Sequence, residues 1–280
     1  MSDGWELTID DDVFGLTASE ETIDLPDGAV GEELVTPSGG EATEIVAPDG
    51  TVVFDSFDIP DAGLLHDYHA AELNLSEGET VSTFTDQSGD DDLSAQDSPT
   101  FRESGINGEP AVEYDGIDDG HESNSAGTTP PWVVFLVVDP TNTGSFTVPW
   151  ADARTSEVDA MFRFDQSGDE YRLELADAGD IEGGTVTTEP IITTWIADDS
   201  DNYQAVRENG SVEVEDTNAS VGSNDLLDGL NLGGDIDVDR RYMEGFVGRK
   251  LVYDLGQLEQ ESSIDAVESG LADEYGINLS

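Results

Sequence analysis

The sequence lacks cysteine and is nearly without positive charge. The absence of cysteine excludes disulfides, thiolate nucleophiles and cysteine-ligated metals. Lysine occurs once, at Lys250, and the nine basic residues stand against 65 acidic ones, for a formal net charge of −56. No basic stripe exists for a phosphate backbone or an anionic membrane to contact. The charge therefore excludes nucleic acid and such membranes as partners.

Long apolar runs are also missing. No stretch reaches the roughly 18 apolar residues of a membrane-spanning helix. Residues 1–7 lack the basic and apolar regions of a secretory signal. We therefore expect synthesis in the cytoplasm, no membrane insertion and no export by a signal peptide. A protein that acts outside the cell would then leave by another route, such as the release of virus particles.

The aromatic content indicates a folded chain. The sequence holds 10 Phe, 7 Tyr and 4 Trp, and the apolar run at 132–138 makes sense only inside a core. The acidic residues are interleaved with apolar ones, so the charge belongs to the surface. Self-repulsion at −56 is severe in dilute buffer, whereas molar salt shortens the Debye length to about 3 Å. We therefore expect a halophilic source and a need for high salt.

Turn residues divide the chain into a small and a large part. In the first 60 residues, short strands such as 5–9 precede a hairpin candidate at 41–54, whose turn is Pro48-Asp49-Gly50. A second turn cluster at 60–63 marks the boundary. The sequence predicts a small N-terminal β module over 1–60, suited to anchoring or assembly, and a larger domain over 61–280.

The larger part alternates short strands with Gly, Asn and Asp turns, which is typical of a sandwich or jelly roll. Residues 170–175 alternate apolar and charged side chains, as a half-buried antiparallel strand does. Asn-Gly at 107–108 and 209–210 predicts type I′ turns. Residues 259–275 carry apolar side chains at helical spacing and end before Gly276, which predicts one C-terminal amphipathic helix.

Three stretches of the larger part carry recognisable motifs. Residues 75–89 run from a strand with an aromatic residue into Asp86-Gln-Ser-Gly89. Residues 105–119 read GINGEPAVEYDGIDD, and residues 244–254 precede a helix with the ending at 271–277. Together they resemble the concanavalin A-like, laminin-G-like jelly-roll family, above all its phage and bacterial surface members. The resemblance covers residues 64–280 and implies an all-β, antiparallel β-sandwich.

The resemblance implies candidates for a binding site. Aromatic side chains at a sandwich rim can stack on sugar rings while polar groups bond hydroxyls, and Trp150, Arg154 and Trp195 are the candidates here. The alternative is that both tryptophans lie in the core. Some relatives bind calcium through loop carboxylates, which makes Asp118 and Asp119 candidates for Ca²⁺ or Mg²⁺. A chain this acidic also holds such pairs by composition alone, and no motif requires a cofactor.

Catalytic motifs are absent. Glycoside hydrolysis needs two carboxylates across a cleft, and the acidic residues at 170–174 and 213–215 do not match the jelly-roll patterns E-x-D-x-x-E or E-x-D-x-E. Serine-nucleophile and P-loop patterns are also missing. His66 and His69 would point to opposite faces of a strand, and with His121 they are interpreted as surface or turn residues. We expect a protein that is not an enzyme.

These observations favour a virion structural protein of a tailed virus that infects a halophilic archaeon. It would be a capsid turret, decoration or fibre subunit on the virion surface, with a lectin-like domain facing outward. Its partners would be further copies of itself in a homo-oligomer, capsid or tail proteins, and host glycans or the S-layer. One alternative is a cellular carbohydrate-binding or adhesion module of a haloarchaeon. A more remote alternative is a glycoside-cleaving enzyme.

Overall fold

A computed structural model of the chain divides into two compact units, Met1–Ile59 and Pro60–Ser280. It describes residues 5–9, 12–16, 44–46, 52–55, 59–89, 91–123, 128–141, 147–151, 160–165, 170–223, 225, 227, 230–235, 241–258 and 261–280. The first unit holds one antiparallel sheet in the order β2-β1-β3-β4, whose strands are β1 (Trp5–Ile9), β2 (Asp12–Leu16), β3 (Glu44–Val46) and β4 (Val52–Asp55). The antiparallel pairing of β3 with β4 agrees with the two strands of the predicted hairpin, whose turn at 48–50 lies outside the described residues.

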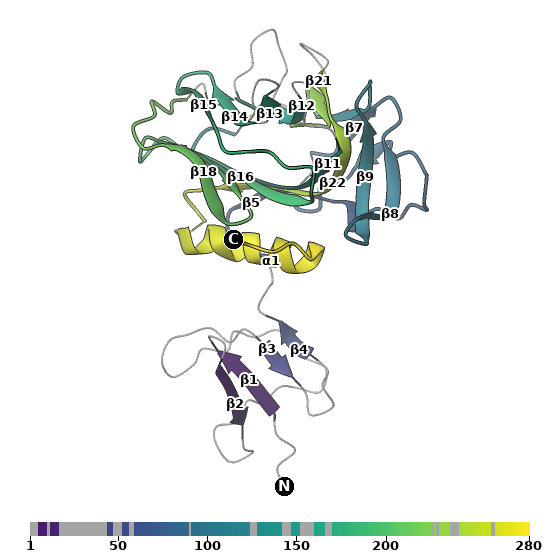
Figure 1. The fold of residues 1–280 in the computed structure, drawn as a ribbon, viewed down its shortest axis with the longest axis vertical. Coiled ribbons are helices and arrows are strands. Elements are labelled where there is room, and N and C mark those ends of the chain that lie inside the picture. The colour runs from purple at the N-terminus through teal and green to yellow at the C-terminus, as the bar shows by residue number, and fades with distance from the viewer. Residues whose placement is uncertain are drawn as a thin grey trace. The chain divides into compact units, whose positions relative to one another are not determined.

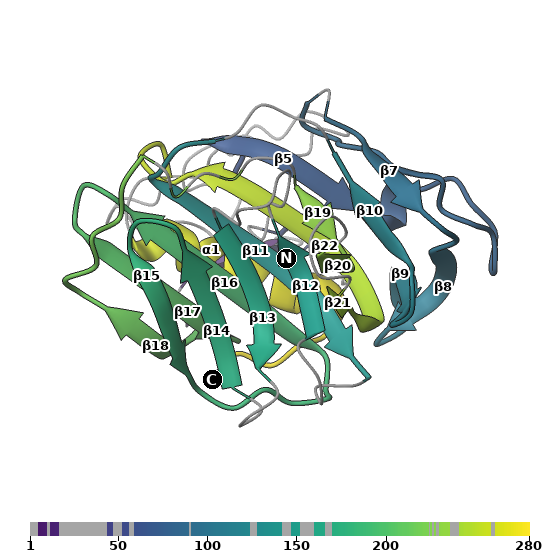
Figure 2. The same ribbon diagram turned by 90° about the horizontal axis from the view of Figure 1, so that it is seen from above.

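The second unit is a sandwich of two antiparallel sheets with a helix against the outside of one of them (Figures 1 and 2). The far sheet is the one away from the helix. In spatial order it contains β15 (Gly179–Gly183), β14 (Glu170–Leu175), β13 (Ala160–Asp165), β12 (Thr147–Ala151), β19 (Asn231–Leu232), β10 (Gly120–Glu122), β7 (Leu93–Gln96) and β6 (Thr83–Phe84).

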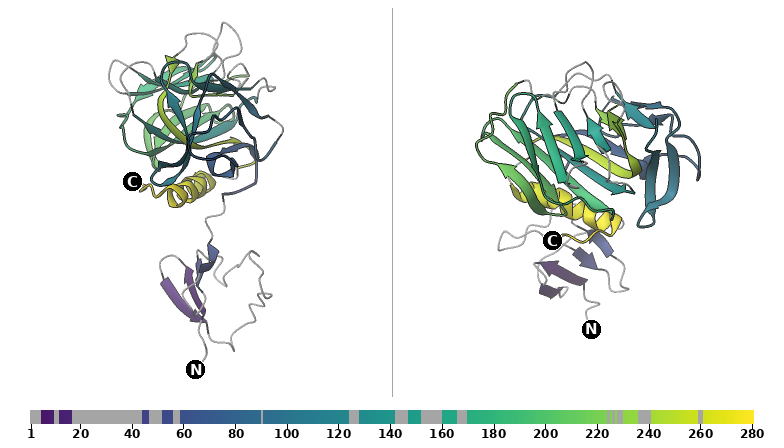
Figure 3. Two further views of the ribbon diagram at one scale, coloured as in Figure 1. Left: turned by 90° about the vertical axis from the view of Figure 1, so that its right-hand side faces the viewer. Right: turned by 45° about the horizontal axis from the view of Figure 1, so that its top comes forward.

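The helix-side sheet lies between the far sheet and the helix, as the two views of Figure 3 also show. In spatial order it contains β18 (Ser211–Asp216), β17 (Tyr203–Glu208), β16 (Ile191–Asp198), β11 (Trp132–Pro140), β22 (Glu244–Asp254), β9 (Glu109–Asp115) and β8 (Thr100–Ile106), with β5 (Leu64–His69) also paired to β22. Two short strands, β20 (Gly234–Asp235) and β21 (Arg241–Tyr242), form a separate antiparallel pair. A 3₁₀ turn, η1 (Ala70–Glu72), follows β5.

The hydrophobic core fills the space between the two sheets. Because side chains alternate along a strand, every second residue of β11 points inward, and Trp132, Val134, Leu136 and Val138 are all fully buried there. The residues between them are buried as well, since the helix-side sheet is covered on both faces. This double coverage explains the unbroken apolar run at 132–138.

The helix α1 (Glu261–Tyr275) forms because its apolar residues repeat at helical spacing: Ile264, Val267 and Leu271 are all buried. It ends at Gly276, whose φ of 60° is a left-handed conformation that favours glycine. The amide of Ile277 donates to the carbonyl of Ala272 at 2.9 Å, which closes a Schellman turn. The helix predicted for residues 259–275 is confirmed over Glu261–Tyr275, and residues 259 and 260 lie outside the described part of the chain.

Two features dock α1 on the helix-side sheet. A side chain at Gly248 of β22 would place its Cβ within 2.5 Å of the Tyr275 ring, so glycine lets the helix end lie directly on the strand. Nearby, Arg249 makes two hydrogen bonds to the carboxylate of Asp67, at 2.9 and 2.7 Å, and one to Glu274 of the helix, at 2.9 Å. Close packing and ion pairs therefore hold α1 against the helix-side sheet.

The structure confirms the all-β sandwich with one C-terminal helix. Both Asn-Gly pairs take positive φ angles, at Asn107 and Gly108 and again at Asn209 and Gly210, as type I′ turns require. The interpretation of the histidines as surface or turn residues was wrong for His66 and His121, which are 8% and 0% exposed. No helix among the described residues is long and apolar enough to cross a bilayer.

Candidate functional site

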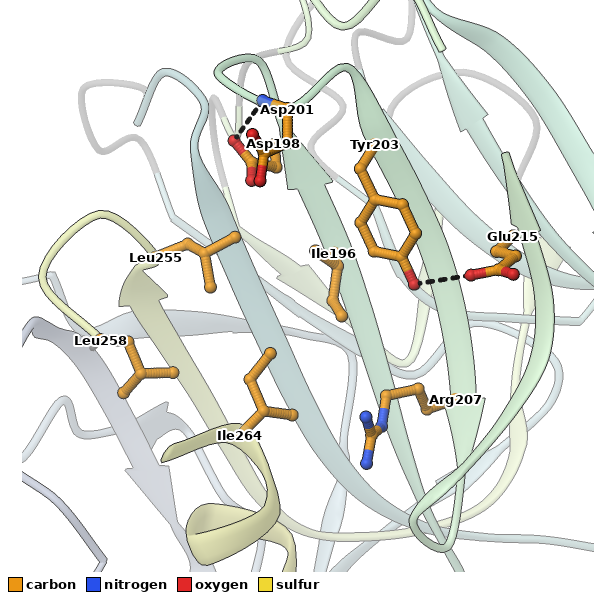
Figure 4. A pocket seen from close by; sticks show the side chains of 9 residues that line it. All are labelled: Ile196, Asp198, Asp201, Tyr203, Arg207, Glu215, Leu255, Leu258 and Ile264. Atoms are coloured by element: carbon orange, nitrogen blue, oxygen red, sulfur yellow. Dashed lines mark hydrogen bonds between the residues drawn. The ribbon is translucent and has the colours of Figure 1, made fainter. Parts of the chain in front are cut away.

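A hollow of about 490 Å³ lies where the outer face of the helix-side sheet meets the start of α1 (Figure 4). We call it the helix-edge hollow. It is lined by residues of β16, β17, β18, the turn after β22 and α1, namely Ile196, Asp198, Asp201, Tyr203, Arg207, Glu215, Leu255, Leu258 and Ile264. Its size is within the range of small-molecule sites.

Strand alternation and helix docking together build this hollow. Tyr203 and Arg207 are four residues apart on β17, so their side chains point to the same face, the one that carries α1. Leu258 and Ile264 stand opposite them, with Ile196 between the two groups (Figure 4). All three of these apolar residues are buried. One wall is therefore apolar, and the other carries an aromatic ring and an arginine.

Carboxylates line the upper end of the hollow. The carboxylate of Asp198 accepts hydrogen bonds from the amide of Ser200 at 2.9 Å, the hydroxyl of Ser200 at 2.7 Å and the amide of Asp201 at 3.3 Å, which fixes the turn after β16. The hydroxyl of Tyr203 donates to Glu215 at 3.1 Å. The half-buried ring of Tyr203 is thereby held in one orientation beside three acidic side chains.

Arg207 lies at the lower end of the hollow and binds the helix. Its Nε and Nη2 donate to the buried Glu268 at 3.0 and 2.8 Å, and Nη2 also donates to Asp265 and to the carbonyl of Gly210. Thr194 donates to the same Glu268 at 2.6 Å. Burial raises the pKa of the Glu268 carboxyl, and the bonds from Thr194 and Arg207 oppose that rise. The positive charge of Arg207 is thus already paired within the fold.

The predicted binding residues lie elsewhere. Trp150 and Trp195 have no exposed surface; their ring centroids are 6.5 Å apart at 79° between the sheets. A fully buried ring cannot present its face to a sugar, so the placement supports the alternative interpretation, in which both tryptophans belong to the core. Arg154 lies outside the described residues.

The predicted metal ligands Asp118 and Asp119 do come together, and Asp97 joins them. One carboxylate oxygen from each of the three lies within 4.8 Å of the others. Desolvation, followed by the neighbouring charges of Asp97 and Asp115, raises the pKa of Asp118. Asp119 already accepts the amides of Ser98 and Asp115, at 2.9 and 3.2 Å, and so holds its loop. Three carboxylates are fewer than the roughly six to eight oxygens that Ca²⁺ takes, and the metal stays a prediction.

The buried carboxylate of Asp86 anchors the motif at 86–89. Asp86 accepts bonds from His66 at 2.8 Å, from the amide of Asp67 at 2.9 Å, and from the amide and hydroxyl of Ser88 at 3.0 and 2.9 Å. Burial alone would raise the pKa of Asp86, but these bonds outweigh it and lower the pKa to about 2. The motif therefore serves the fold, because it ties the loop to β5.

Comparisons with known proteins show the fold of the chain but no sequence family. No family model and no curated protein matches it. The solved structure of Trypanosoma rangeli sialidase matches 89% of this chain with a TM-score of 0.55 and 14% identity, and its complex with sialic acid matches with 0.54 and 13%. Domain 4 of AbnA, a GH43 arabinanase from Geobacillus stearothermophilus, has a TM-score of 0.49 and 16% identity over 70% of this chain and 94% of that domain.

The chain covers only 36% of the sialidase chain, and at this identity the likeness concerns the fold alone. The fold is confirmed as a concanavalin-like β-sandwich. The expectation that the protein is not an enzyme is corrected, because this sandwich occurs in the structure of a glycoside-acting enzyme and the fold therefore does not argue against catalysis. These matches give no support to a viral or halophilic context, and both stay predictions.

Sequence reasoning missed the helix-edge hollow. The signal that could have pointed to it is local: Tyr203 and Arg207 are four positions apart in a stretch that can form a strand, and Asp198 and Asp201 stand just before it. The opposite wall comes from Leu255, Leu258 and Ile264, some 50 positions later in the chain. Only the docking of α1 brings the two walls together, and the sequence does not state where the helix docks.

Proposed function

We propose that the sandwich, Pro60–Ser280, is a carbohydrate-binding domain and that the helix-edge hollow holds a neutral glycan. One observation carries this proposal: a single hollow combines an oriented aromatic ring, an apolar wall and carboxylates at its rim. Sugar rings have apolar faces that pack on aromatic and aliphatic side chains, and hydroxyls that donate to carboxylates. Tyr203 is the stacking residue of the proposal, and Asp198, Asp201 and Glu215 are its acceptors.

The charge of the hollow favours a neutral sugar. Asp198, Asp201 and Glu215 contribute negative charge, while the cation of Arg207 is paired with Glu268 and Asp265. An anionic ligand would enter a negative hollow on a protein of net charge −56, and repulsion opposes this. We therefore propose neutral hexose or pentose glycans and not acidic sugars as the ligands.

The presence of three carboxylates in one hollow also favours a second candidate, cleavage of the bound glycan. Glycosidases use one carboxyl group as an acid and another as a base or nucleophile on either side of the scissile bond. In this candidate, Glu215 on β18 and Asp198 at the end of β16 would face the same sugar. The biological setting of the domain stays a prediction from the sequence: a virion appendage or, alternatively, a cellular adhesin. A glycan-binding groove is compatible with either.

The test is a glycan array of neutral and acidic oligosaccharides in molar NaCl, followed by titration calorimetry on the best ligand. We expect neutral glycans to bind and acidic ones to be rejected. Tyr203→Ala should lower the affinity about tenfold, because stacking on the ring is lost. Tyr203→Phe keeps the ring, and its affinity for the glycan should lie within about threefold of that of the wild type.

Binding of acidic glycans alone, or equal affinity of Tyr203→Ala and the wild type, would contradict the proposal. For the second candidate, release of new reducing ends from the bound glycan is measured in the same salt. Glu215→Gln should abolish that release while the glycan still binds, whereas unchanged release by Glu215→Gln would exclude this catalytic role.

A further inference from the structure

A second hollow adjoins the helix-edge hollow on the other side of Arg207. It has a volume of about 410 Å³ and lies between the β17–β18 turn, α1 and the last residues of the chain. We call it the tail hollow. Arg207 lines both hollows. Val212 pairs directly with Arg207 across β17 and β18, so the sheet face that carries Tyr203 continues into the tail hollow.

At this junction, the Nη1 nitrogen of Arg207 makes no hydrogen bond to the described residues. The side chain is only 6% exposed, and all its hydrogen bonds to the described residues are made by Nε and Nη2. Among these residues Nη1 has no acceptor, and it is not one of the fully buried polar atoms. Nη1 therefore reaches solvent, where water can accept its hydrogen bond, and a ligand oxygen at the junction can take the place of that water.

The tail hollow offers apolar surface that the fold leaves uncovered. Among the described residues, three large hydrophobic side chains are exposed, and two of them, Val212 at 45% and Leu279 at 38%, line this hollow. The third, Ile117, lies in a distant turn and is 70% exposed. The acidic groups of the tail hollow, Asp265 and Glu268, are those already paired with Arg207. The surface therefore suits an uncharged ligand with apolar faces.

We infer that the two hollows form one groove, which takes a linear neutral oligosaccharide that crosses Arg207. Nη1 donates to an oxygen of the sugar at the crossing, while Val212 and Leu279 pack on the apolar face of the sugar beyond it. This inference rests on the proposed function and extends it, since it specifies a chain of several units and not a single sugar. It predicts that affinity depends on the length of the ligand.

Calorimetry with unbranched gluco- and manno-oligosaccharides of one to six units, in molar NaCl, tests the inference on the full chain. The six-unit ligand should bind about tenfold more tightly than the two-unit ligand. The double variant Val212→Ser/Leu279→Ser should remove that gain and leave the affinity for the two-unit ligand within about twofold. Ile117→Ser, at the other exposed apolar residue, is the matched control and should change neither value.

The outcomes separate the inference from the proposed function. Short sugars that bind with an affinity independent of length would overturn the inference and leave the proposed function standing. An equal loss at every length in the double variant would also overturn it, because Val212 and Leu279 would then not form a separate subsite. If no sugar of any length or class binds, the proposed function fails and the inference fails with it.

Discussion

The two faces of the helix-side sheet are held in different ways. The inner face carries aromatic and aliphatic side chains such as Trp132 and Trp195, which pack against the far sheet with no exposed surface. The outer face carries Thr194, Arg207 and Arg249, and these bind the acidic residues of α1 and β5 through charged hydrogen bonds. One face is stabilised by burial of apolar area, and the other by pairing of charges that burial would otherwise penalise.

This difference shows where a protein with so few basic residues places them. Of the nine basic residues, Arg207 and Arg249 lie under the C-terminal helix, each between two acidic partners. Removing one partner leaves a buried charge unpaired, whereas removing an inner-face ring leaves a cavity. The two faces can therefore be told apart by experiment.

The largest effect is expected on the inner face. Trp195 is fully buried beside Trp150 and Tyr171, so Trp195→Ala should lower the free energy of unfolding by about 5 kcal/mol through lost burial and a cavity. Urea unfolding in molar NaCl measures this change. Ile117→Ala, at an exposed position, should lie close to the wild type. A loss below about 2 kcal/mol for Trp195→Ala would mean that the ring is not a major part of the core.

A somewhat smaller effect is expected on the outer face. Arg207→Leu leaves the carboxylate of Glu268 buried without its cation and should cost about 4 kcal/mol. Arg207→Leu/Glu268→Leu removes both charges and should recover more than half of that loss. The same urea experiment compares the two. A double variant as unstable as the single one would show that packing, and not charge pairing, stabilises the outer face.

The smallest effect concerns a titrating group inside the sandwich. Burial lowers the pKa of His121 from the 6.5 that is usual for histidine to about 4, while a bond to the carbonyl of Val81 opposes that shift. Between these two values the unfolded chain binds the proton and the folded one does not, so stability falls as the pH drops from 6.5 to 4. The wild type should lose about 3 kcal/mol more than His121→Gln over this range.

Urea unfolding of both proteins at pH 7, 5.5 and 4 measures that difference. The comparison with His121→Gln cancels the titration of the many surface carboxylates, which both proteins share. Parallel pH profiles would mean that His121 is protonated as easily in the folded chain as in the unfolded one.

The sequence was sufficient for those parts of the fold that follow from local patterns. Alternation predicted the strand at 170–175, positive-φ dipeptides predicted two turns, and helical spacing predicted α1. The candidate site was not predictable in this way. Arg207 and Glu268 are 61 positions apart, and Asp67 and Arg249 are 182 apart, so their pairing depends on tertiary packing. The tryptophans were candidates because composition does not distinguish a buried ring from a ring at the rim.

The position of Lys250 has a chemical consequence. This residue, the only lysine of the chain, is fully buried on β22, with its nitrogen 5.2 Å from the centre of the Trp150 ring. A reagent that acylates amines reaches the side chain only when β22 separates from its neighbours. The rate at which Lys250 becomes labelled therefore measures how often the sandwich opens. Mass spectrometry would report it as one mass increment on the peptide that contains Lys250.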